Sequence, residues 1–127
     1  MTRPVEDLHI TKIHPLITPV ILMNDFQMSE ENRQLVSGSR NAIERILDGE
    51  DNRRIAIVGP CSIHDPDAAV EYASRLKVET QTFSNLLVVM RVYFEKPRTV
   101  VGWKGLISDP DIDGSFDINK GLRLARE

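Results

Sequence analysis

Two short apolar runs, separated by a segment with helical spacing, limit what this chain can fold into. The first run covers residues 54–58 (RIAIV) and the second covers residues 86–93 (LLVVMRVY). Continuous apolar runs of this length are typical of strands that are buried on both faces of a parallel sheet. Between them, Asp65 and Pro66 indicate a helix start, and an apolar stripe continues to about Gln81. The pattern therefore predicts a strand–helix–strand unit of an α/β fold.

The segments on either side of this unit predict further helices. A short helix is expected at residues 18–25, where proline follows a threonine N-cap, and a longer one at residues 29–49, between a serine N-cap and a glycine. Asp117 is expected to cap a last helix. Residues 1–14 show a weak alternation of apolar and polar side chains, which favours a short arm strand.

Composition narrows the class of function. The chain has 127 residues, of which 41% are hydrophobic and 28% are charged, and its net charge is −3. These values are ordinary for a globular domain and argue against a general nucleic-acid binder. No apolar run approaches the roughly 18 residues of a membrane span, and the N-terminus lacks an apolar signal region, so we expect a cytoplasmic protein. The single cysteine excludes an intrachain disulfide.

A cluster of cations begins near the end of the second apolar run and continues past it. Arg91, Lys96, Arg98 and Lys104 lie within 14 residues of one another, and only Glu95 offsets them. Guanidinium and ammonium groups at the end of a buried strand favour an anionic ligand, and phosphate is the obvious candidate. A solvated, positively charged loop explains the same composition about as well. The residues alone leave both interpretations open.

Two other motifs suggest metal chemistry only weakly. Cys61 follows the first strand, at the edge where α/β folds carry their sites, and could be a structural thiol, a metal ligand or a reactive thiol. His64 completes a C-x-x-H pair, but we interpret it as a polar loop residue because one such pair is a weak signal. Residues 109–114 (DPDIDG) imitate half of a calcium loop, but Lys120 occupies the position that requires glutamate, which favours an acidic turn.

The motifs GPCSIHDP at 59–66 and MRVYFEKPRTVVGWKGLISDPDIDGSF at 90–116 are more specific. They resemble the type I, metal-dependent 3-deoxy-D-arabino-heptulosonate 7-phosphate (DAHP) synthases. The resemblance implies a (β/α)8 TIM barrel with an N-terminal extension, of which the two predicted strands would be the first two. It also implies condensation of phosphoenolpyruvate, D-erythrose 4-phosphate and water to DAHP and phosphate, the first step of the shikimate pathway of aromatic amino acid biosynthesis.

The resemblance also implies roles for individual residues. Cys61 would be a ligand of a divalent metal ion, with manganese, iron, cobalt and zinc all open. Arg91 and Lys96 would be catalytic residues that bind phosphoenolpyruvate, with Lys96 near the reacting carbon as a candidate proton donor. The aldose phosphate would be held by the turn that follows, Pro97, Arg98 and Thr99. Glu6 and Asp7 become candidates for a feedback-inhibitor site for an aromatic amino acid, shared with a neighbouring chain of a homo-oligomer.

The resemblance covers only about the N-terminal third of such a synthase. We therefore expect residues 1–50 to be an N-terminal extension and residues 51–127 the start of a barrel that is cut off inside a helix. The remaining metal ligands, a histidine, a glutamate and an aspartate, would lie beyond residue 127, and the 127-residue polypeptide alone should be inactive. The alternatives are a non-catalytic regulatory or oligomerisation module derived from such a synthase, and a phosphate-binding protein with unrelated chemistry.

Overall fold

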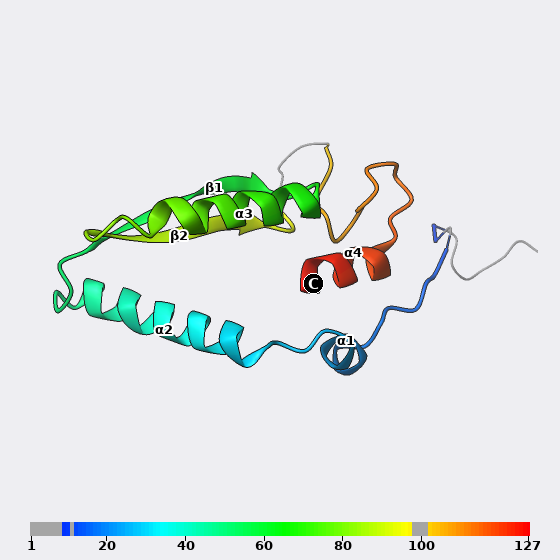
Figure 1. Ribbon diagram of the computed structural model, residues 1–127. Coiled ribbons are helices and arrows are strands. Elements are labelled where there is room, and N and C mark those ends of the chain that lie inside the picture. Colours follow the sequence, from blue (N-terminus) through cyan, green and yellow to red (C-terminus); the bar gives the residue numbers. More distant parts are fainter. Residues whose placement is uncertain (1–8, 11, 98–101) are drawn as a thin grey trace, which may run out of the picture.

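The structure, a computed structural model, describes residues 9–10, 12–97 and 102–127. Along the chain these residues form helices and strands in the order shown in Figure 1: α1 (Pro19–Asp25), α2 (Glu30–Leu47), β1 (Arg54–Ser62), α3 (Pro66–Thr80), β2 (Leu86–Tyr93) and α4 (Ile118–Arg126). The described part is thus an α/β fold with four helices and a two-stranded sheet.

The sheet confirms the predicted strand–helix–strand unit. Strands β1 and β2 pair in parallel, and the register runs from Arg54 opposite Leu86 to Val58 opposite Met90. Helix α3 connects them and lies along the strands, whose arrows point toward the same end of the molecule in Figure 1. The carboxyl ends of both strands therefore meet at one edge, which is where the sequence places Cys61 and the cations.

Local capping explains why the helices begin where the sequence predicts. The side chains of Ser29, Asp65 and Asp117 each accept the backbone N–H three residues ahead, at 3.1 Å, and so satisfy an otherwise unpaired donor of the first helical turn. Thr18 makes no such bond, and α1 begins instead with Pro19, whose ring fixes a helical φ. All four predicted helices are confirmed.

Three expectations about the strands are wrong. The first strand extends to Ser62 rather than ending at Val58, and residues 9–10 and 12–18 form no strand, while the other positions of the predicted arm lie outside the described residues. Burial of β1 on both faces is also wrong, because 65% of Ile57 is exposed. Two strands with one helix beside them do not enclose their side chains, and among the described apolar residues only Ile63 and Leu106 are buried.

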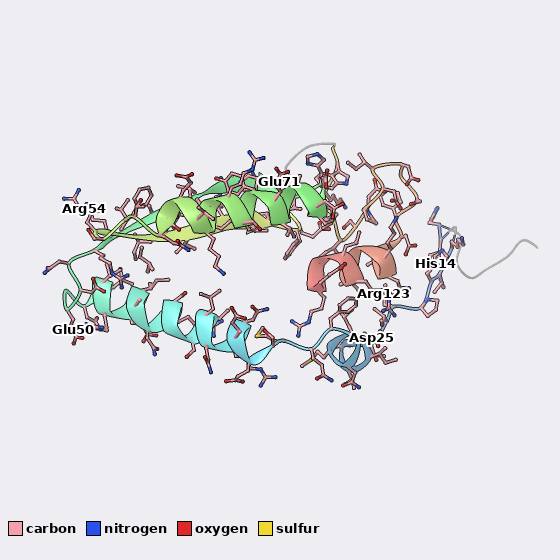
Figure 2. All side chains as sticks on the ribbon, viewed as in Figure 1. His14, Asp25, Glu50, Arg54, Glu71 and Arg123 are labelled. Carbon is pink, nitrogen blue, oxygen red and sulfur yellow. The ribbon has the colours of Figure 1, made fainter. Side chains whose placement is uncertain are left out.

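The segment before α1 and the end of α1 are attached to α4. One side-chain amide, that of Asn119, accepts the N–H of Ile17 at 2.8 Å and donates to the carbonyl of Pro15 at 3.0 Å. Farther along, Arg123 donates to the carboxylate of Asp25 at 2.7 Å, and Figure 2 shows these two side chains pointing toward each other. These contacts join segments about 100 residues apart, so the predicted division at residue 50 stays a prediction.

Candidate functional site

The carboxyl end of β1 departs from regular pairing. The register shifts between Val58 and Cys61, so that an extra residue is inserted opposite β2. Within this bulge Gly59 has φ 144°, and a Cβ placed on it would lie 2.8 Å from the carbonyl oxygen of Arg91. Cys61 has φ 75°, a left-handed conformation that is unfavourable for any residue with a side chain. Strain of this kind is concentrated at functional sites.

The bulge brings Cys61 next to a cation near the end of β2, Arg91, and to one that follows β2, Lys96. Lys96 Nζ lies 3.8 Å from Cys61 Sγ. Burial of the thiol opposes its ionisation, but the positive charges of Arg91 and Lys96 and hydrogen bonding with Ser62 outweigh this effect, so the pKa of Cys61 lies below its usual value. The thiolate is the form that binds metals and acts as a nucleophile. Two cations and one thiol from two strand ends thus form the centre of the candidate site.

The cations of this site have no carboxylate partners within the described part of the chain. The ion pairs there involve Arg45, Arg53, Arg75, Lys120 and Arg123, and none involves Arg91, Lys96 or Lys104. Arg91 instead lies over the ring of Tyr93, with its guanidinium carbon 5.1 Å from the ring centroid. A cation–π contact orients the guanidinium without neutralising it. The arrangement therefore favours an anionic ligand over a self-neutralised loop.

Backbone contacts join the described residues on either side of the segment that carries the remaining predicted residues. Glu95 and Gly105 form an antiparallel bridge, and the N–H of Lys96 donates to the carbonyl of Lys104 at 3.1 Å. Trp103 donates its indole N–H to the carbonyl of Asp109 at 2.7 Å. Lys96 and Lys104, the described residues on either side of this segment, are thus held next to each other.

The structure places some of the predicted site residues and leaves others untested. It brings together Cys61, Arg91 and Lys96, and it places Pro97, which is exposed, directly after Lys96. Four predicted positions lie outside the described residues: Arg98, Thr99, Glu6 and Asp7. His64 is exposed.

Sequence reasoning missed the role of two carboxylates near the site. The sequence suggests that Glu95 offsets the charge of the cations. In the structure, its side chain accepts the backbone N–H of Ser108 at 2.6 Å. Asp109, which is only 8% exposed, accepts the N–H of Gly114 with both oxygens at 3.2 Å. Both side chains bind backbone, and the sequence carries no signal for this because the partners are main-chain groups brought close by folding.

A divalent metal ion needs more ligands than this arrangement supplies. Within the described residues, no three His, Cys, Asp or Glu side chains lie close enough to hold a metal ion together. Cys61 is a suitable single ligand because its thiolate is favoured, but the described residues alone do not fit a catalytic metal, which takes about three protein ligands.

Comparison with known proteins agrees with the motifs. The model of the DAHP synthetase I family matches residues 25–126, which is most of the chain. The chain belongs to the DAHP synthetase I family. The match includes the bulge at Gly59, Cys61 and the whole cation cluster.

The relatives in this family are much longer than the chain. It is 53% identical over 123 residues to the Phe-sensitive phospho-2-dehydro-3-deoxyheptonate aldolase of Escherichia coli K12, covering 96% of the chain and 35% of the relative. The phenylalanine-inhibited aldolase of Saccharomyces cerevisiae is 48% identical over 126 residues, covering 98% of the chain and 34% of the relative. The chain thus spans about a third of the length of these curated relatives.

A solved structure shares the fold. The phospho-2-dehydro-3-deoxyheptonate aldolase of Francisella tularensis SCHU S4 matches with a TM-score of 0.85 and 50% identity, over 92% of this chain and 35% of that one. At this identity and score, the two-stranded sheet and its helices correspond to a part of that DAHP synthetase fold. Among the residues that the structure describes, no helix is long and apolar enough to cross a bilayer.

Proposed function

We propose that this chain forms the phosphate-binding wall of a DAHP synthase active site. The reaction would join phosphoenolpyruvate and D-erythrose 4-phosphate, add water, and release inorganic phosphate. One observation carries the proposal: Lys96 lies 3.8 Å from Cys61, and Arg91, whose charge also acts on that thiol, has no ion-pair partner in the described residues. Both substrates bear phosphate, which accounts for an excess of cations at one strand edge.

Each residue has a separate part in this proposal. Arg91 and Lys96 bind phosphoenolpyruvate, and Lys96 acts as a proton donor near the reacting carbon. Cys61 supplies one metal ligand, and the other ligands come from the length of the relatives that this chain does not span. The aldose phosphate is assigned to Pro97, Arg98 and Thr99.

The finer fold and the regulation belong to the same proposal. We assign β1 and β2 to the first two strands of a (β/α)8 barrel, supported by their parallel pairing and the helix between them. We also assign feedback inhibition by an aromatic amino acid, because the names of the relatives include both Phe-sensitive and Trp-sensitive enzymes. Cytoplasmic location and a homo-oligomer stay predictions.

A hybrid synthase tests the proposal directly. In this hybrid, the chain replaces the segment of the E. coli Phe-sensitive enzyme with which it aligns. We expect the hybrid to condense the two substrates and the purified 127-residue chain alone to give no product. A folded, soluble hybrid without activity would overturn the proposal, and product from the chain alone would contradict the assignment of the missing ligands. Inhibition of a full-length synthase by the inactive chain alone would favour the regulatory-module alternative.

The metal assignment needs a readout other than activity. Cobalt(II) bound to a thiolate gives a charge-transfer absorption band that it lacks with oxygen and nitrogen ligands alone. We expect this band in the cobalt-loaded hybrid synthase and its loss in Cys61→Ala. A variant that keeps the band would show that the thiol is not a ligand.

A further inference from the structure

The base of the loop at residues 96–104 is held by very few contacts. One antiparallel bridge, Glu95 with Gly105, connects its two ends in the described part of the chain, through the backbone hydrogen bond from Lys96 to Lys104. A single hydrogen bond of this kind contributes only about 1 kcal/mol. A further contact beside Lys96, which follows the end of β2, would therefore add substantially to this base.

The side chain of Glu95 supplies that additional contact. Its Oε1 accepts the N–H of Ser108 at 2.6 Å, which is short for such a bond. Although Arg91, Lys96 and Lys104 are close to Glu95 in the sequence, it forms no ion pair with any of them in the described residues. Its charge is directed at the backbone of the following loop rather than at the candidate ligand site.

The segment that receives Glu95 is itself held tightly. Leu106 is 1% exposed and is the largest fully buried side chain among the described residues. On one side of this segment, a Cβ placed on Gly105 would lie 2.2 Å from the carbonyl oxygen of Phe94. On the other side, a Cβ placed on Gly121 of α4 would lie 2.3 Å from the carbonyl oxygen of Ile107. Residues 105–107 are therefore enclosed between the loop base and α4, and Ser108 follows directly.

We propose that Glu95 is a positioning residue, which anchors the loop base to the Ser108 backbone and so holds Lys96 at Cys61. This inference rests on the proposed function, because it assigns Lys96 a part in the reaction. Lys96 is the next residue in the chain, so a shift of the Glu95 backbone moves the Lys96 backbone with it, and we expect the Lys96 ammonium to lose its 3.8 Å contact with the Cys61 sulfur. A misplacement of about 1 Å from a distant change lowers rates by about 10²-fold.

Three substitutions of Glu95 in the hybrid synthase separate positioning from charge. Glu95→Ala removes the acceptor and should lower kcat/KM about 100-fold. Glu95→Gln keeps an oxygen at the same reach and should lower it only about tenfold, because a neutral acceptor retains about half the strength of the bond. Glu95→Asp keeps the charge but is one methylene shorter, and should resemble Glu95→Ala.

The ranking of Gln and Asp decides the proposal even if Glu95→Ala does not fold. Higher activity in Glu95→Gln than in Glu95→Asp, with an unchanged pH profile, supports positioning. Activity in Glu95→Asp equal to or above that in Glu95→Gln means that the negative charge itself is required, and overturns it. The control is Asp113→Ala, which removes a carboxylate that also accepts a backbone N–H, from Ser115 at 2.9 Å, in an exposed turn. Its kcat/KM should match the unaltered hybrid.

The unaltered hybrid separates this inference from the proposed function. If the unaltered hybrid is folded but inactive, the proposed function and the role of Glu95 are both wrong. If it is active and Glu95→Asp equals or exceeds Glu95→Gln, only the role of Glu95 is wrong.

Discussion

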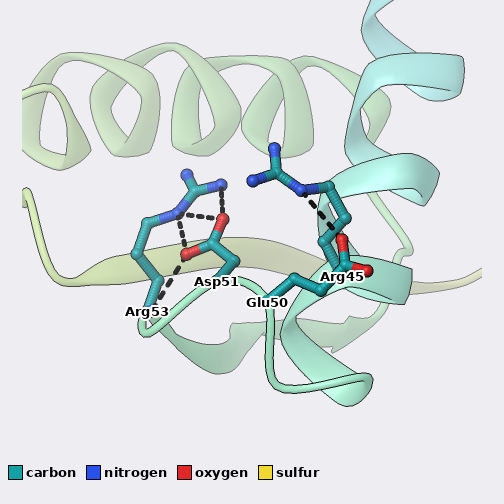
Figure 3. Close-up of polar contacts among 4 residues, drawn as sticks. All are labelled: Arg45, Glu50, Asp51 and Arg53. Atoms are coloured by element: carbon teal, nitrogen blue, oxygen red, sulfur yellow. Dashed lines mark hydrogen bonds and ion pairs between the residues drawn. The ribbon is translucent and has the colours of Figure 1, made fainter.

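The two ends of the parallel strands carry the same kinds of charge but use them differently. At the amino end, Arg53 makes a forked contact with Asp51, with Nη2 to Oδ2 at 2.7 Å, and Arg45 pairs with Glu50 (Figure 3). At the carboxyl end, Arg91 and Lys96 have no carboxylate partner in the described residues.

This difference separates charges that are paired within the fold from charges that stay free for the proposed ligand. A cation that is paired within its own chain has its charge offset and holds a turn in place. A cation left unpaired beside a strained cysteine keeps its charge for a ligand, as expected where charge must be stabilised during a reaction. The comparison predicts that substitutions at the carboxyl end change activity and that those at the amino end change only stability.

The largest effect is expected at Lys96. In the hybrid synthase, Lys96→Met should lower kcat about 10²- to 10³-fold, the usual cost of losing one preorganised charged group, with little change in melting temperature. Steady-state kinetics and a thermal melt measure the two quantities. A decrease in kcat of less than about tenfold would show that Lys96 takes no part in the reaction.

The next largest effect on activity is expected at Arg91. Arg91→Gln is expected to lower kcat/KM for phosphoenolpyruvate roughly 10- to 100-fold, which is what hydrogen bonds to a charged group contribute. The matched control at the amino end is Arg53→Gln, for which kcat/KM should stay unchanged. An equal decrease in kcat/KM for both substitutions would show that the two edges do not differ in their effect on activity.

Substituting a glycine at each of the two edges should change the stability of the protein by different amounts. Gly59→Ala adds a Cβ 2.8 Å from the Arg91 backbone at φ 144°, and should lower the free energy of unfolding by about 2–4 kcal/mol. Gly49→Ala meets no atom within 4 Å at φ 78°, and should cost only about 1 kcal/mol, from backbone strain alone. Urea unfolding of the hybrid synthase measures both. Equal losses of unfolding free energy in the two variants would show that the backbones of β1 and β2 do not approach each other this closely at the bulge.

The smallest effect concerns the Asp51–Arg53 pair. Hydrogen bonds from the Arg53 side chain and backbone lower the pKa of Asp51 from 3.8 to about 2. Since the pKa is lower in the folded state, the pair stabilises the fold above about pH 4, and this contribution is lost as the pH falls toward about 2. A carbon-detected NMR titration should give a midpoint near 2 for Asp51 in the folded protein, and Arg53→Gln should move it up. An unshifted midpoint would contradict the forked contact.

Local signals in the sequence predicted the elements well. Ser29, Asp65 and Asp117 cap helices with their own side chains, so the start of each helix could be read from neighbouring residues. The second strand agrees with its apolar run, Leu86–Tyr93. The end of the first strand was missed because its last residues belong to a bulge, whose pairing depends on β2 and not on the residues of β1 alone.

The sequence by itself determined the four helices, the positions of the two strands and the presence of a cation cluster, because each depends on residues close together in the chain. Only the tertiary structure decided which cations are paired, that Cys61 adopts φ 75° within 3.8 Å of Lys96, and that Glu95 binds the Ser108 backbone. These features depend on distances between atoms that are 13 to 35 residues apart. Such distances are set by strand register and loop closure, which no local pattern of side chains encodes.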